Sequence, residues 1–259
     1  MPTTERSKSG QRMRHTMYGR LLATEVIALL GLRLMQQEPR LTSLVYLLIS
    51  GVAVLTTIPI LQMSWYPPTE ARPTSRTIYF ERGGLPTLLT LKWMWLSAVL
   101  TEVIWQYAIW FRPGLGTHIS ILHMLTWLAL MLALLRRMLH ALVAESVINE
   151  YVVMGAVAGY LLIGFTGGVM MNSLLTIDPG AFLLNTDNLI IDGKLLPASI
   201  YYSATILGTA FSSLTTLGTT IINPNNMGGQ TIQICIAILG QLYIAILIAG
   251  ILGKARQWK

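Results

Sequence analysis

The sequence predicts an all-helical integral membrane protein with six transmembrane helices and a re-entrant helix and loop between the fifth and sixth. Three observations support this fold class. The 259-residue chain is 53% hydrophobic and 11% charged, whereas soluble domains average roughly 25% charged residues. Apolar segments of about 20 residues, the length that crosses a bilayer, recur between short polar breaks. Finally, residues 195–253 contain no Asp, Glu, Lys or Arg.

The net charge of +7 lies at the two ends of the chain. Residues 1–20 hold five basic side chains against one acidic side chain, and residues 254–259 add three basic ones, so residues 21–253 are neutral overall. A nucleic-acid-binding protein would carry its basic residues along a folded face. This distribution therefore argues against a nucleic-acid partner and, with the apolar composition, against a soluble enzyme. The single cysteine, Cys235, excludes a disulfide framework and a multi-cysteine metal site.

Each expected span ends at a recognisable break. The first five cover residues 21–35, 41–63, 88–111, 119–135 and 151–175. Proline-containing breaks follow the first three, and Arg136 with Arg137 follows the fourth, before a polar helical stretch that reaches residue 150. The basic tail of residues 1–20 is followed by a four-helix membrane domain over residues 21–150. Glu25 and Arg33 interrupt the first apolar run, which favours a retained span over a cleaved signal peptide.

An even number of spans brings both termini to one side of the membrane. With this topology, 13 Lys and Arg residues lie in the two tails, the 64–87 linker and the Arg136–Arg137 pair, against three on the opposite face. Cytoplasmic loops carry the basic excess in membrane proteins. The sequence thus predicts a multi-pass protein of the plasma membrane with both termini cytoplasmic and the lipid bilayer as its surroundings.

The uncharged stretch of residues 195–253 is too long for one helix and too short for two spans with an ordinary loop. Its middle is polar, with Ser, Thr and Asn side chains between positions 212 and 226. Non-helical backbone at membrane depth requires burial in protein or a water-filled cavity. A short helix over residues 199–211, a turn rich in Thr and Gly, and a final span satisfy this requirement. Tetrameric cation channels have the same arrangement, with threonine hydroxyls and backbone carbonyls replacing the hydration shell of an ion.

The segment Ser213-Leu214-Thr215-Thr216-Leu217-Gly218-Thr219-Thr220-Ile221-Ile222-Asn223-Pro224 resembles the pore loop of bacterial potassium channels, which typically reads Thr-Leu-Thr-Thr-Leu-Gly-Tyr-Gly-Asp-Ile-Thr-Pro. Residues 238–249 resemble the inner helix of that family, and residues 159–164 and 179–182 resemble its outer helix and following loop. The similarity covers residues 147–253 and implies a pore domain over residues 151–259. It also implies a homotetramer that conducts a monovalent cation, potassium or sodium, with no cofactor and no metal beyond the pore ion.

The resemblance assigns the filter to Thr215, Thr216, Leu217, Gly218, Thr219 and Thr220. The tyrosine of the family pattern is replaced by Thr219, its second glycine by Thr220, and the following acidic residue by Ile221. A β-branched residue does not readily adopt the positive φ that glycine tolerates. Three hypotheses remain: a cation pore with weak or altered selectivity, a pore for another ion, and a channel fold that no longer conducts and serves as a scaffold or accessory subunit of a larger membrane complex.

Other polar residues within the expected spans have two interpretations each. Glu25 and Glu102 are intramembrane carboxylates, which indicates a proton or cation relay or, alternatively, an interhelical bond, for example with Arg33 or Lys92. Gly240 is a hinge of the inner helix or a close helix crossing. The fourth span lacks the regularly spaced basic residues of a voltage sensor before Arg136. The hydrolase and metalloprotease motifs are also missing, so we expect no enzymatic activity.

Overall fold

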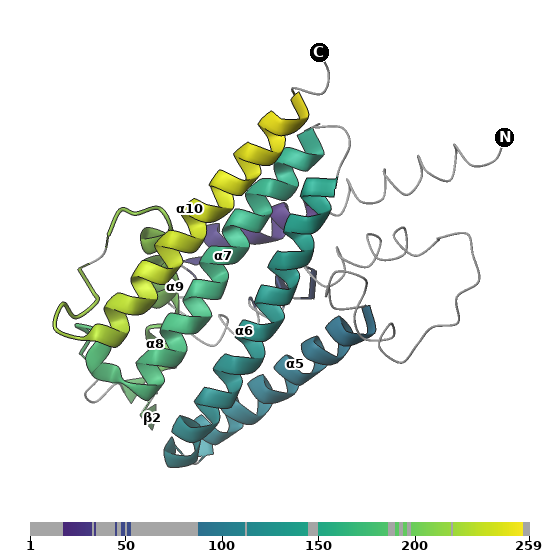
Figure 1. Ribbon diagram of the computed structural model, residues 1–259. Helices are drawn as coiled ribbons and strands as arrows, with labels where there is room; N and C mark the ends of the chain where they lie inside the picture. Colours follow the sequence, from purple (N-terminus) through teal and green to yellow (C-terminus); the bar gives the residue numbers. More distant parts are fainter. Residues whose placement is uncertain are drawn as a thin grey trace.

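The structure is a computed structural model in which helices make up almost all of the regular secondary structure (Figure 1). It describes residues 18–32, 34, 45, 48, 49, 51, 52, 88–111, 113–144, 150–185, 190, 191, 194, 195, 198–218 and 220–255. Residues 18–30 are helical. The named helices are α5 (Leu88–Phe111), α6 (Pro113–Ala144), α7 (Glu150–Ile177), the 3-10 helix η1 (Pro179–Ala181), α8 (Ala198–Tyr201), α9 (Ser203–Leu214) and α10 (Met227–Ala255). Most of the span expected over residues 41–63 lies outside the described residues.

Three of the described helices are long and apolar enough to cross a membrane. They are residues Ile121–His140 within α6, Glu150–Ile177, which form α7, and Met227–Ala249 within α10. The length and apolar composition of these three helices support the integral membrane character predicted from the sequence. Of the six predicted spans, these three correspond to the fourth, fifth and sixth.

The break predicted at Pro113 is where one helix ends and the next begins. α5 ends at Phe111 and α6 starts at Pro113. A proline is tolerated in the first turn of a helix, because the N–H that it lacks would have no helical partner there. α6 therefore begins before the expected residue 119, and it continues beyond residue 135 to Ala144. The helix continues through Arg136 and Arg137, as expected from the polar helical stretch predicted after this span, and Arg137 is buried.

α7 is the central helix of the bundle. It packs against α6, α9 and α10, while α5 packs against α6 (Figure 1). Small residues allow these contacts: a methyl group added at Gly164 would lie 2.6 Å from Cζ of Phe211 on α9, and one added at Gly167 would lie 2.7 Å from Cδ1 of Ile236 on α10. The same helix contacts residue 18 of the first helix, whose ring is 3.0 Å from a methyl built on Gly155. Close glycine-mediated packing of this kind is common between helices in membranes.

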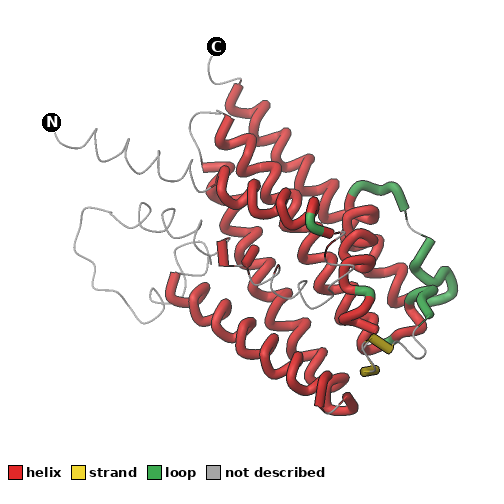
Figure 2. The backbone as a smooth tube through the Cα atoms, turned by 180° about the vertical axis from the view of Figure 1, so that it is seen from behind, coloured by secondary structure: helices red, strands yellow, loops and turns green. Residues whose placement is uncertain are grey.

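The segment between α7 and α8 contains the two short strands β1 (Ile190–Ile191) and β2 (Lys194–Leu195), which pair in antiparallel fashion. The longer described loops lie together at one side of the helical bundle (Figure 2). An isolated bridge joins Phe182, just after η1, to Ile222. The chain after α7 is thereby fixed to the chain that leads into α10.

Candidate functional site

The candidate site is the turn that follows α9. Helix α9 ends at Leu214, and its last turn continues through hydrogen bonds from the Thr216 N–H to the Ser213 carbonyl (3.1 Å) and from the Leu217 N–H to the Ser212 carbonyl (3.0 Å). The chain then reverses through two residues of positive φ, Thr216 (59°) and Gly218 (75°). A left-handed conformation costs a residue with a Cβ about 1–2 kcal/mol. Such backbone outliers concentrate at functional sites.

The expected filter residues that the structure describes are all exposed. This holds for Thr215, Thr216, Leu217, Gly218 and Thr220, while Thr219 lies outside the described residues. Leu217 is 82% exposed, the highest value among the large hydrophobic residues of the described chain. An apolar side chain and several backbone groups thus face outward at one place, where a single copy of the chain provides no cover.

The positive φ at residue 216 differs from the sequence expectation. From the sequence, the residue of interest is Thr220, which replaces the second glycine of the family pattern and, being β-branched, is expected to avoid a positive φ. The structure instead records positive φ at Thr216 and, as the pattern requires, at Gly218. The first of these follows from the helix end, because the bond from Leu217 back to Ser212 closes a turn that needs a left-handed residue.

Polar side chains hold the chain after the turn. Asn223 donates from Nδ2 to the Gly180 carbonyl (2.9 Å), and its backbone N–H donates to the Ala181 carbonyl (3.0 Å). Asn226 caps α10, because its Oδ1 accepts from the Gly229 N–H at 3.0 Å. The other end of that amide donates to Oδ2 of Asp178 at 2.8 Å. These bonds fix the position of the turn relative to the end of α7.

Three helices meet at the last residue of α9. The Tyr160 hydroxyl of α7 donates to the Leu214 carbonyl at 3.2 Å. On α10, a methyl built on Gly240 would lie 2.5 Å from Cδ1 of Leu214 and 3.3 Å from its carbonyl oxygen. Gly240 therefore lies at a close helix crossing, one of the two roles expected for it. Its role as a hinge stays a prediction.

α10 is the most apolar of the three span-length helices, yet it has the smallest share of buried residues. About 17% of its apolar window is buried within the chain, compared with 72% for α7. The buried positions form a single stripe: Gly229, Ile236, Gly240 and Tyr243. The hydroxyl of Tyr243 donates to the Ala156 carbonyl of α7 at 2.9 Å. Half-buried residues such as Ile232 and Leu247 flank this stripe, and most of the remaining surface of α10 is exposed in the described part of the chain.

Glu25 and Glu102, the carboxylates expected within spans, are both buried, in different surroundings. Glu102 accepts from Nε2 of Gln106 (3.0 Å) and lies 2.6 Å from Nε2 of His123 on α6. The ring of Trp105 stacks on His123, with centroids 4.6 Å apart and planes at 7°. Lys92 is exposed on α5, the same helix as Glu102, and the partner of Glu102 on a neighbouring helix is His123.

Sequence reasoning missed His123 because its partnership depends on how α5 and α6 dock. The signal that could have found it is the presence of a polar side chain on each of two consecutive apolar helices. Glu25 differs from Glu102, since neither of its carboxylate oxygens has a hydrogen-bond partner in the described structure. Arg33, the other suggested partner, lies outside the described residues.

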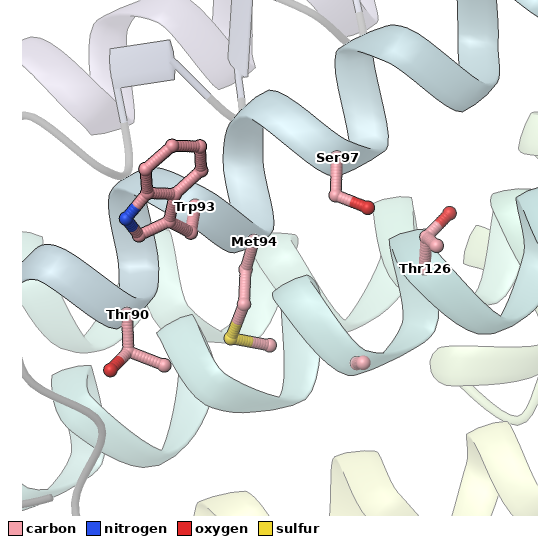
Figure 3. A pocket seen from close by; sticks show the side chains of 6 residues that line it. Thr90, Trp93, Met94, Ser97 and Thr126 are labelled. Carbon is pink, nitrogen blue, oxygen red and sulfur yellow. The ribbon is translucent and has the colours of Figure 1, made fainter. Parts of the chain in front are cut away.

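A cavity of about 510 Å³ lies between α5 and α6, away from the turn (Figure 3). Its lining residues are Thr90, Trp93, Met94, Ser97, Thr126 and Ala129. The polar side-chain groups in this set are three hydroxyls and the indole N–H of Trp93. None of the six residues is titratable near neutral pH. This lining offers no general acid, general base or metal ligand. Among the described residues there is also no group of three His, Cys, Asp or Glu side chains that could hold a metal ion.

In comparisons with protein-family models, curated proteins and solved structures, nothing matches this chain.

Proposed function

We propose that the chain is the subunit of a homotetrameric membrane protein that conducts cations through a central pore formed by α10 and the turn after α9. It crosses the bilayer six times, with both termini cytoplasmic and α8, α9 and the turn as the re-entrant segment. The resemblance of residues 147–253 to bacterial potassium channels supports this proposal. The single observation that carries it is the exposed, uncharged surface of α10 beside an exposed turn of threonine and glycine.

The burial pattern favours several copies of the chain. α7 is buried by its own chain, while α10 presents most of its apolar surface outward next to Leu217 and Gly218. Four copies around an axis would bring four such turns together, and their carbonyls and hydroxyls could replace part of the hydration shell of a cation. The lack of an acidic residue at Ile221 and the substitutions at Thr219 and Thr220 favour altered or lost potassium selectivity.

The experiment combines the oligomeric state with flux. We expect the purified full-length chain to be a tetramer in native mass spectrometry and to pass potassium or sodium into liposomes. Gly218→Val should abolish flux while the tetramer persists, since a β-branched residue holds φ near 75° only at an energetic cost. Gly208→Ala is the matched control, because nothing lies within 4 Å of the added methyl. A tetramer without potassium, sodium or calcium conductance would refute the transport function.

The second candidate is a non-conducting scaffold or accessory subunit of a larger membrane complex. The observation that favours it is the turn at Thr216, where the chain bonds back to α9 in place of an extended row of carbonyls. One copy of the chain bound to unrelated subunits in a native membrane preparation would support this candidate. A homotetramer would favour the channel.

A further inference from the structure

The outward surface of α10 contains one amide in an otherwise apolar line. Gln241 is exposed and lies near the middle of α10. At about 100° per residue, its side chain is about 100° from that of Gly240, about 140° from that of Ile236 and about 160° from that of Tyr243. These three residues contact α9 and α7. Gln241 therefore faces away from the bundle of its own chain.

The neighbours of Gln241 on this side form a continuous line. They recur at spacings of three and four residues and are all exposed: Ile234, Ile238, Ala245 and Ile248. The line consists of side chains suited to lipid or to another helix, with the exception of the amide at its centre. Polar side chains within a span usually face a partner or a water-filled cavity, because lipid offers no hydrogen bond. A lipid-facing position for Gln241 is therefore unfavourable.

The position of Gln241 along α10 follows from the contact that its neighbour Gly240 makes. Gly240 touches Leu214, the last residue of α9, and the turn at Thr215–Gly218 follows directly. Gln241 thus lies about 1.5 Å further along α10 than the contact with the base of the turn. In a pore formed by several copies, Gln241 would therefore lie just beyond the turn, on the side that faces the carboxyl end of α10.

We infer that Gln241 of each copy lines a water-filled cavity next to the turn, where its side-chain oxygen contacts the permeating cation. This inference rests on the proposed function and assigns a specificity-determining residue to it. An amide oxygen is an acceptor that can replace a water molecule around a hard cation without adding a fixed charge. Four such amides, one from each copy, would provide polar contacts for the cation next to the uncharged turn.

Cysteine accessibility tests this inference without requiring ion flux. Cys235 is the single cysteine and is exposed on α10, so the background is the full-length chain with Cys235→Ala. Gln241→Cys is then treated in liposomes with a charged, membrane-impermeant methanethiosulfonate reagent, and the mass increase is followed over time. The matched control is Leu100→Cys, a position on α5 that is 58% exposed. We expect Gln241→Cys to react at least about tenfold faster than Leu100→Cys, since a charged reagent is excluded from lipid.

The outcomes separate this inference from the proposed function. Equal reaction at residues 241 and 100 in a tetramer that conducts would overturn the inference and leave the pore intact. A chain that forms no tetramer would overturn both. If Gln241→Cys does not fold, Ala245→Cys on the same line replaces it, with the same expected rate difference. Gln241→Leu provides a second measurement, with lower cation flux expected from an intact tetramer and unchanged flux arguing against the cation contact.

Discussion

Gly164→Ala tests the packing of α9 against α7, on which the position of the turn depends. The added methyl would lie 2.6 Å from Cζ and 2.7 Å from Cδ1 of Phe211, which are separations that real Cβ atoms do not reach. Phe211 cannot easily swing away, because its ring also packs edge-on against Phe165 with centroids 5.3 Å apart. Overpacking of a core costs about 1–3 kcal/mol. Alanine recovers about 0.5–1 kcal/mol relative to glycine within a helix, so we expect a net loss of roughly 0.5–2 kcal/mol.

The assay is reversible unfolding in mixed micelles of a mild detergent and dodecyl sulfate, followed by helical circular dichroism. Gly208→Ala on α9 is the control, because it makes the same chemical change where nothing lies within 4 Å. We expect this control to equal or exceed the wild-type free energy of unfolding. If both variants were stabilised to the same extent, the close approach of α7 and α9 described here would be wrong.

Three further predictions use the same assay. His123→Ala should cost about 3–5 kcal/mol, because it removes one partner from the buried bond with Glu102, whereas His118→Ala on an exposed face should change the free energy of unfolding by less than about 0.5 kcal/mol. Tyr243→Phe should cost about 0.5–1.5 kcal/mol through loss of its hydrogen bond to α7, and no change would show that this bond is not made in the membrane protein. Thr216→Gly should be neutral or stabilising by up to about 1 kcal/mol because it relieves a left-handed β-branched residue, and a clear loss of stability would contradict the positive φ at this position.

Helix bounds are predicted best where backbone chemistry alone decides them. The helix over residues 88–111 agrees with the structure because Pro113 cannot continue a hydrogen-bonded ladder from the preceding turn. The start of α6 is predicted less well, at residue 119 in place of Pro113, because an apolar run marks where a span enters the membrane. Polar residues mark where a span should leave the membrane, whereas the helix itself ends only where the backbone no longer makes helical hydrogen bonds.

The site is less accessible to sequence reasoning because its key contacts join distant residues. The amide of Asn226 joins Asp178 to α10 across 48 positions of sequence. Glu102 and His123 meet only because α5 and α6 pack at one particular height. A pattern of residue types predicts that a buried carboxylate needs a partner, but the choice among the available partners depends on tertiary packing.

The contrast between α7 and α10 shows that apolar composition does not reveal whether a helix is surrounded by its own chain. Both helices are apolar along their length, and both were expected to span the membrane. α7 has glycines where neighbouring side chains insert, so the protein itself surrounds it. On α10, Gly229 and Gly240 lie on the inner stripe, and branched side chains such as Ile238 lie on the outside. Lipid would suit the branched side chains as well as another subunit would, because helices in a bilayer gain little from hydrophobic association. The amide of Gln241 is the feature that distinguishes these two environments, since lipid would leave it without a hydrogen bond.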